Sequence, residues 1–288
     1  MSASGWKTWA RRAGMIALAG AAAVAQGAPR ELAVPGGVAW VKVGEVDAAV
    51  ADLLPPPKVY FQDKRVLVHK REGAWYALVG LPLSLGPGEY ALKVVAPGAG
   101  ARTTQAGFTV TDKRYPEQRL VIKDTRKVTP GPEELARIQR EQQIIDRVKH
   151  RWEEVAEVDL SFRLPANGPL SSRFGLKRFF NGQPRNPHAG LDVAIPGGTP
   201  VMAAAAGTVS NTGDYFFNGN TVFVDHGQGL VSMYCHLDRI DVKEGERLTA
   251  GQRLGLSGMT GRATGPHLHW SVILNGTMVD PELFISGR

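Results

Sequence analysis

Cysteine and histidine are scarce in this sequence of 288 residues, and long apolar runs are absent beyond its first 25 residues. With one cysteine, Cys235, the chain can form no intramolecular disulfide. We expect Cys235 to be a buried structural thiol, because free cysteine usually packs as a small hydrophobic residue; a catalytic nucleophile is the weaker alternative. In an apparent strand, Cys235 is expected to point to the face opposite that of its neighbour His236. No later segment is long and apolar enough to cross a bilayer, which takes about 20 residues. The mature chain is therefore expected to have no stable membrane insertion.

The N-terminal residues have the pattern of a secretory signal peptide. Lys7, Arg11 and Arg12 supply positive charge, and a small, apolar stretch follows them and ends in Ala-Val-Ala at 23–25, an A-x-A cleavage site. A retained membrane anchor is the alternative, but the run is short and mostly alanine. We expect residues 1–25 to be removed on export to the periplasm or cell envelope.

The charge balance is only mildly basic. The formal net charge is +7, from 34 Lys and Arg against 27 Asp and Glu, and removal of the three N-terminal positive charges leaves +4 (7 − 3). Outside the cytoplasm such a balance suits anionic surfaces such as cell wall or lipid headgroups, although it also serves solubility alone. Nucleic acid is not expected as a partner in that compartment.

The first part of the mature chain, residues 36–112, has the pattern of a small β-sandwich of immunoglobulin-like kind. Short runs rich in β-branched and aromatic residues alternate with proline and glycine turns, and none of them carries visible chemistry. The expected strands are 38–43, 58–61, 65–69, 75–79, 89–95 and 107–111.

Residues 113–160 form a polar connector with a possible strand at 119–123 and an amphipathic helix from about 129 to about 157. Its apolar residues recur at steps of three and four. We expect this face to dock on one of the domains, with a dimerising coiled coil as the alternative; the oligomeric state is left open. Residues 123–127 and the helix are also a candidate autoinhibitory contact. The apolar face consists of Leu135, Ile138, Ile145, Val148, Trp152 and Val155.

The remaining residues, 161–288, predict a mainly antiparallel β domain, because glycine is frequent and the apolar runs are too short for helices. Asn275-Gly276 is a strong hairpin signal. The fold class is therefore mainly β, with two β domains joined by a helical linker. The expected strands are 191–195, 207–210, 221–224, 230–236, 252–257 and 267–274.

Potential metal ligands are concentrated in three short elements of this second domain. They are H-x-x-x-D at 188–192, a single histidine at 236, and H-x-H at 267–269. Residues two apart in a strand share a face, so His267 and His269 are expected to point into one cleft. Gly190 is expected to give the backbone the freedom to bring His188 and Asp192 to the same ion. The other histidines, His69, His150 and His226, are expected to be structural or solvated.

Two imidazoles and one carboxylate suit zinc, since three protein ligands leave a fourth position for water at a catalytic site. The same ligands also describe a mononuclear iron oxygenase, but those enzymes usually work inside cells. Four histidines and an aspartate are more ligands than one tetrahedral ion can bind. The two histidines that do not bind the ion are expected to act on the water and the substrate.

In this order, the motifs resemble those of the lysostaphin-type, or LytM-domain, zinc endopeptidases that cut peptide bonds in bacterial peptidoglycan. The resemblance covers roughly residues 165–284 and includes flanking sequence segments such as Ser-Arg-Phe-Gly at 172–175 and Gly-Met-Thr-Gly at 258–261. It implies that one Zn²⁺ binds His188, Asp192 and His269. His236 and His267 would then be the unligated catalytic histidines.

The resemblance implies an enzyme that hydrolyses peptide cross-links between peptidoglycan stem peptides, and the predicted signal peptide implies its export. Zinc would lower the pKa of its water towards about 7, and one of the two free histidines would accept the proton while the other assists the oxyanion or leaving amine. The D-Ala to diaminopimelate bond is the favoured target, with a pentaglycine bridge as the alternative. A non-catalytic relative that activates a cell-wall amidase is the other reading, although no expected residue is missing.

Substrate contacts are sought in two segments near the ligands. Arg178, Asn181 and Tyr215 are candidates, with Arg178 or Arg185 pairing a carboxylate of the peptide. Both segments are interpreted as loops dense in aromatic residues. The alternative is that these aromatic residues pack beneath the sheet. The role of the first domain, docking or autoinhibition, is left open.

Overall fold

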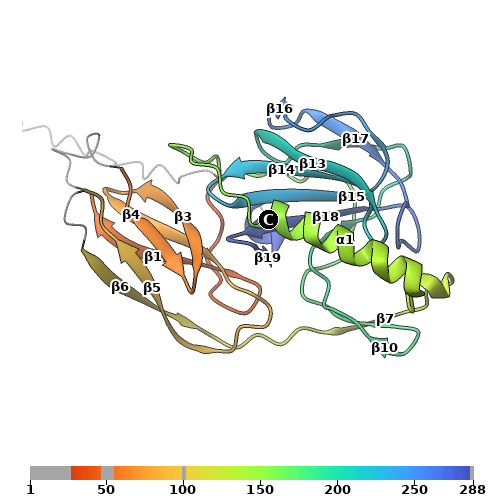
Figure 1. Cartoon of the computed structure of the whole chain (residues 1–288), viewed down its shortest axis with the longest axis horizontal. Helices are drawn as coiled ribbons and strands as arrows, with labels where there is room; N and C mark the ends of the chain where they lie inside the picture. Colours follow the sequence, from red (N-terminus) through yellow and green to blue (C-terminus); the bar gives the residue numbers. More distant parts are fainter. Residues whose placement is uncertain (1–26, 47–54, 99–101, 286–288) are drawn as a thin grey trace, which may run out of the picture.

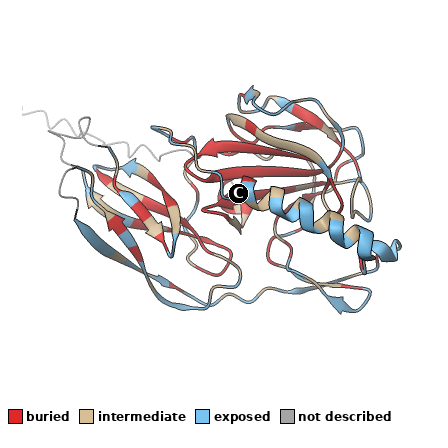
Figure 2. Cartoon of the chain, in the orientation of Figure 1, coloured by how far each residue is buried: buried red, intermediate tan, exposed pale blue. Residues whose placement is uncertain are grey.

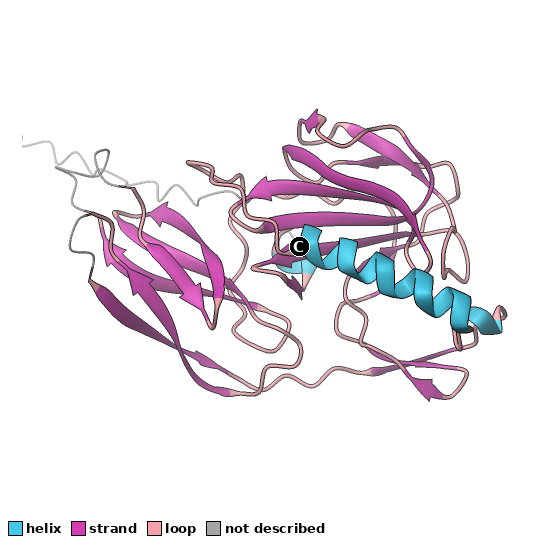
Figure 3. Cartoon of the chain, in the orientation of Figure 1, coloured by secondary structure: helices cyan, strands magenta, loops and turns pink. Residues whose placement is uncertain are grey.

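The protein is described by a computed structural model over residues 27–46, 55–98 and 102–285. The expected signal peptide, residues 1–25, lies outside these ranges. Within them, no helix has both the length and the apolar character needed to cross a membrane. The chain is mainly β, as expected (Figure 3). A six-stranded sheet lies to the left in Figure 1, and a ten-stranded sheet lies to the right with the helix α1 in front of it. A small three-stranded sheet lies below the helix.

The N-terminal sheet has six antiparallel strands in the order β1-β4-β3-β2-β5-β6. Each was expected, and they surround a core that includes Phe61, Leu81 and Leu92. Buried residues alternate with more exposed ones in β2 and the second half of β5, whereas β3 and β4 contain runs of consecutive buried residues. The sheet is continuous and barrel-like, so the immunoglobulin-like description holds only loosely. The strands are β1 (Val38–Glu45), β2 (Lys58–Phe61), β3 (Lys64–Arg71), β4 (Ala74–Gly80), β5 (Gly88–Val95) and β6 (Thr103–Val110).

The connector first crosses to the second sheet and then turns back as the helix (Figure 1). Strand β7 (Glu117–Leu120) pairs in parallel with β9 (Lys177–Phe180), which also pairs with β10 (Gln183–Pro184). A short 3-10 helix, η1 (Thr125–Lys127), precedes α1 (Pro132–Lys149). Residues 177–180 therefore form a strand, and their interpretation as a loop was wrong.

The predicted end of the helix near Glu157 was also wrong, since α1 ends at Lys149. The backbone of His150 is no longer helical. Both its backbone N–H and its ring donate to the carbonyl of Asp146. Beyond it, Trp152 and Val155 lie against Gly229 and Gly227 of the C-terminal sheet. The apolar periodicity thus continues past the helix because these residues pack on the sheet in an extended segment.

The C-terminal sheet is antiparallel, with the order β16-β13-β14-β15-β18-β11-β8 and additional pairs of β12 with β17, β17 with β15, and β19 with β18. Its central strands are almost wholly buried, whereas the outer face of α1 is exposed (Figure 2). The elements are β8 (Leu170–Ser172), β11 (Leu191–Val193), β12 (Pro200–Met202), β13 (Gly207–Tyr215), β14 (Gly219–Gly227), β15 (Leu230–Ile240), β16 (Arg247–Leu248), β17 (Arg253–Ser257), β18 (Leu268–Leu274), β19 (Thr277–Val279) and η2 (Pro281–Leu283).

The two faces of this sheet bury different cores. Tyr234 and Trp270 belong to one face, whose core also takes in residues of the N-terminal sheet. Met233, Cys235 and Ile273 belong to the other, where they pack with residues of α1. Cys235 is fully buried and burial raises the pKa of its thiol to about 12, so the expectation of an inert structural thiol is met.

The two sheets are joined by buried polar contacts as well as by apolar packing. The Asn275 side chain accepts from the backbone N–H of Gly80 at 2.6 Å and donates to its carbonyl at 3.1 Å. Gln228 accepts from the N–H of Val68 at 3.0 Å. Asn275 lies in the predicted hairpin turn, with a φ of 43°, so this turn also docks one sheet on the other. The domain boundaries at 112/113 and 160/161 stay a prediction.

Candidate metal centre

Three side chains expected to bind metal converge where β11 meets β18. Asp192 and His269 are paired across these strands, and His188 lies in the loop that leads into β11. Oδ1 of Asp192 is 3.0 Å from Nε2 of His188 and 2.7 Å from Nδ1 of His269, and the two ring nitrogens are 3.0 Å apart. One ligand atom from each residue thus faces a common point.

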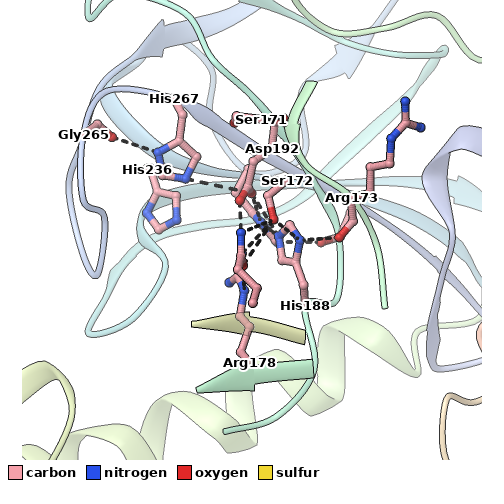
Figure 4. Close-up of polar contacts among 12 residues, drawn as sticks. Ser171, Ser172, Arg173, Arg178, His188, Asp192, His236, Gly265 and His267 are labelled. Carbon is pink, nitrogen blue, oxygen red and sulfur yellow. Dashed lines mark hydrogen bonds and ion pairs between the residues drawn. The ribbon is translucent and has the colours of Figure 1, made fainter. Parts of the chain in front are cut away.

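The outer nitrogen of each of these imidazoles has its own partner. Nδ1 of His188 lies 2.8 Å from the carbonyl oxygen of Arg173 (Figure 4). Because a carbonyl only accepts, Nδ1 carries the proton and Nε2 presents its lone pair to the centre. Nε2 of His269 lies 3.0 Å from the hydroxyl of Ser271, which leaves Nδ1 facing inward. Such partners hold a ligating ring in the required orientation.

Asp192 divides its two carboxylate oxygens between two tasks. Oδ1 faces the imidazoles, whereas Oδ2 accepts a hydrogen bond of 3.1 Å from Arg178 (Figure 4). Burial alone would raise the pKa of this carboxyl, but its contacts with the rings of His188 and His269 hold the pKa below its usual range. The ionised form that a metal ligand requires is therefore favoured.

Gly190 has a different role from the one expected. Its φ is not in the left-handed region, so backbone freedom does not explain it. A Cβ at this position would instead lie 2.6 Å from Cε1 of His269, Oγ of Ser271 and the carbonyl of Trp270. The absent side chain allows the loop of His188 to approach the strand that carries His269.

The two remaining histidines of the motif lie beside this group. The ring centroids of His236 and His267 are 4.7 Å apart, and Nε2 of His267 lies 3.9 Å from Oδ1 of Asp192. Nδ1 of His236 donates to the carbonyl of Thr260, and Nδ1 of His267 donates to that of Gly265, both at 2.8 Å. Each ring therefore presents an unprotonated Nε2. Burial lowers the pKa of His236 to about 3.

His236 reaches the metal face only because its strand is irregular. Strict alternation would put it on the face of Tyr234, opposite Cys235, and this was expected. Its φ of 61° and a register shift in the pairing with β14 break the alternation. Its ring centroid thus lies 6.0 Å from that of His269, and His236, His269 and Met233 line one cleft. The opposite-face expectation for Cys235 was wrong.

The cleft has a volume of about 320 Å³, and α1 forms one of its walls. Ile138, Glu141 and Ile145 of the helix line it together with His188 and His269. Glu141 fixes the helix in place by accepting from the backbone N–H of Phe216 at 2.8 Å. The helix expected as a docked linker is therefore part of the site.

The predicted substrate contacts occupy different positions. Arg178 lines the cleft but is engaged with Asp192, and Tyr215 lines it with a largely buried ring. Asn181 is tied to the connector, since its amide exchanges two hydrogen bonds with the backbone of Ile122. Arg185 donates to the carbonyl of Val128 at 2.7 Å.

Sequence reasoning missed Arg262, which also lines the cleft and stacks on two aromatic rings. It directly follows the Gly-Met-Thr-Gly segment, which was interpreted only as part of the family resemblance. An arginine within a glycine-rich loop beside the H-x-H motif was the available signal.

Two family models match the chain. Peptidase family M23 matches residues 186–281, and the M23 N-terminal domain matches residues 31–113. A crystal structure from Pseudomonas aeruginosa that is assigned to peptidase M23 is similar with a TM-score of 0.72 and 44% identity, covering 90% of this chain and 97% of that one.

Curated relatives are similar over a shorter region. The chain is 44% identical over 112 residues to the peptidoglycan DD-endopeptidase ShyA of Vibrio cholerae, covering 38% of this chain and 26% of that protein. It is 42% identical over 94 residues to the DD-carboxypeptidase/endopeptidase Mpg of Neisseria meningitidis, covering 33% and 22%. The match therefore spans only about a quarter of the length of these relatives.

Proposed function

This chain belongs to peptidase family M23, and on that basis we propose that it is an exported zinc metalloendopeptidase that hydrolyses peptide cross-links of bacterial peptidoglycan. The observation that carries the proposal is the convergence of five side chains from three distant segments. His188, Asp192 and His269 meet at one point, and His236 and His267 flank it with unprotonated Nε2 atoms.

The residues present fit a zinc ion. Two nitrogens and one carboxylate oxygen face one another at contact distance, which is costly for groups that offer lone pairs unless a cation or proton lies between them. Their outer atoms are already bonded to Arg173, Ser271 and Arg178. Iron accepts the same ligands, so metal analysis of the purified protein is part of the test.

When bound, zinc supplies Lewis acidity, which lowers the pKa of water and polarises the scissile carbonyl. The residues of the chain then handle the proton. Since both Nδ1 protons are committed to backbone carbonyls, the Nε2 atoms of His236 and His267 act first as acceptors. One takes a proton from the attacking water, and the charged imidazole returns it to the leaving amine.

The proposed substrate is the cross-link between stem peptides, most simply the D-Ala to diaminopimelate bond. Support comes from similarity to relatives named DD-endopeptidases. The predicted signal peptide agrees with this substrate, because it would carry the protein to the cell envelope. The pentaglycine bridge is the alternative substrate.

The test is digestion of purified sacculi by the zinc-loaded protein, followed by mass spectrometry of the released muropeptides. Conversion of cross-linked dimers to monomers, stopped by a chelator and restored by zinc, is the expected result. A protein that holds zinc and leaves the dimers intact would contradict the proposal and favour a non-catalytic activator of an amidase. That alternative is disfavoured because none of the five side chains is replaced.

A further inference from the structure

Arg262 lies in the loop between β17 and β18 and reaches the wall of the cleft that holds the metal ligands. Its guanidinium carbon is 4.2 Å from the ring centroid of Phe217 and 4.8 Å from that of Phe180. The backbone N–H of Arg262 donates to the carbonyl of Phe217 at 2.8 Å. The guanidinium thus contacts two aromatic side chains.

This cation has almost no partner in the part of the chain that the structure describes. Its one side-chain hydrogen bond runs from Nη1 to the carbonyl of Lys127 at 3.3 Å, and no ion pair forms within 4.0 Å. Burial lowers the pKa of Arg262 to about 10, and the positive charges of Arg178 and Arg185 act in the same direction. A half-buried cation without a counter-charge is unfavourable on its own.

The two neighbouring arginines have hydrogen-bond or ion-pair partners that Arg262 lacks among the described residues. Arg178 has the carboxylate of Asp192, and Arg185 donates to three oxygens, of Pro184, Gln183 and Val128. Of the five donors on a guanidinium, Arg262 uses one, so the remainder can bind an anion in the cleft. A planar group fixed by stacking is suited to a carboxylate, which it can bind through two parallel hydrogen bonds.

We propose that Arg262 anchors a free carboxylate of the peptide substrate and so selects stem peptides that carry one near the bond to be cleaved. This inference rests on the proposed function, since it concerns the substrate of the same cleft. It gives Arg262 the role that the sequence had assigned to Arg178 or Arg185. The competing explanation is that Arg262 only clamps the loop against Phe180 and Phe217.

Binding of a stem peptide that lacks a cross-link separates these explanations without requiring turnover. The probe is L-Ala-D-isoglutamate-diaminopimelate-D-Ala, together with versions in which each carboxyl in turn is a carboxamide. Titration calorimetry uses the whole zinc-loaded protein. For one of the carboxyls, the wild type is expected to bind the acid at least about tenfold more tightly than the amide.

Arg262→Gln should bind the acid as weakly as the wild type binds that amide, and Arg262→Lys should recover part of the difference. The matched control is Arg119→Gln, because Arg119 stacks on Phe179 at 4.3 Å but has an ion-pair partner in Glu117. This control should keep the full preference. Zinc content and thermal unfolding of each variant identify any loss of fold.

Two results would overturn the inference. One is a wild-type protein that binds all amides as tightly as the acid. The other is an Arg262→Gln protein that weakens acid and amides by the same factor, as a purely structural residue would. Digestion of sacculi by the wild type is measured in parallel. Failure there removes the proposed function, while the acid and amide affinities still decide the role of Arg262.

Discussion

Arg178 donates a hydrogen bond of 3.1 Å to Oδ2 of Asp192, the oxygen turned away from the two ligand imidazoles. The contact is largely buried, since the exposed fractions of the two side chains are 18% and 10%. Arg178 therefore orients the carboxylate and leaves Oδ1 facing the proposed zinc position. Sequence reasoning had placed Arg178 on the substrate and had not anticipated this contact.

Arg178→Gln is expected to weaken zinc binding about 10- to 100-fold, because the carboxylate loses the partner that orients it. Competition with a chromogenic chelator measures the affinity. Arg119→Gln is again the control, since Arg119 is largely exposed and pairs with Glu117. Unchanged affinity in Arg178→Gln would show that Asp192 is positioned without it.

His236→Ala should retain zinc and lose activity by about 10²- to 10⁴-fold, the usual contribution of a general acid or base. Asp192→Ala should lose both zinc and activity, because Asp192 supplies one of three ligand atoms. Metal content and cleavage of cross-linked muropeptides are measured on the same preparations. A metal-free His236→Ala protein would overturn the division into ligands and catalytic histidines.

Gly190→Ala should weaken zinc binding and destabilise the fold by about 1–3 kcal/mol, because the new methyl group would overlap His269, Ser271 and the backbone of Trp270. Thermal unfolding with and without zinc measures both effects. Gly197→Ala is the matched control, since a Cβ there meets no atom within 4 Å. Equal behaviour of the two variants would refute the close-approach explanation.

Stability should fall as the pH drops from about 6.5 towards 4, because of His226. The ring is buried between the carbonyl of Ala206 and the hydroxyl of Ser232, and burial lowers its pKa to about 4. Below pH 6.5 the unfolded chain binds a proton that the folded chain does not, so the folded state loses up to about 3 kcal/mol across this window.

Urea unfolding of the zinc-free protein at several pH values tests this. His226→Gln should be less stable at pH 7 but lose less stability on acidification than the wild type. His150→Gln, which changes an exposed ring, should follow the wild type. If His226→Gln and the wild type lose the same free energy between pH 6.5 and 4, another group is responsible.

Much of the fold was predictable because local sequence patterns mark its strands. The six N-terminal strands and the central strands of the second sheet are runs of β-branched and aromatic residues between turn signals. The parallel pairing of β7 with β9 was not predictable in this way. It joins Glu117 to Lys177, and its stability comes from contacts that no local pattern encodes.

The candidate site was likewise predictable only where local sequence spacing determines the geometry. The H-x-H spacing predicts that His267 and His269 point to the same side, and the structure agrees, since both imidazoles lie near Oδ1 of Asp192. The left-handed backbone at His236 is imposed by tertiary contacts, among them the hydrogen bond from its N–H to the carbonyl of Asn218. The ends of α1 and the partners of Arg178 and Arg262 depend on such contacts as well.

Strand β18 begins next to His267 and ends at the turn containing Asn275, which is bonded twice to Gly80. One strand, roughly 20 Å long at the usual rise per residue, thus runs from the contact with the N-terminal sheet to the candidate metal centre. The strand that carries His269 is thus also the strand whose far end reaches the turn docked on Gly80. A substitution that loosened this turn would therefore act on the same seven-residue strand that positions His269.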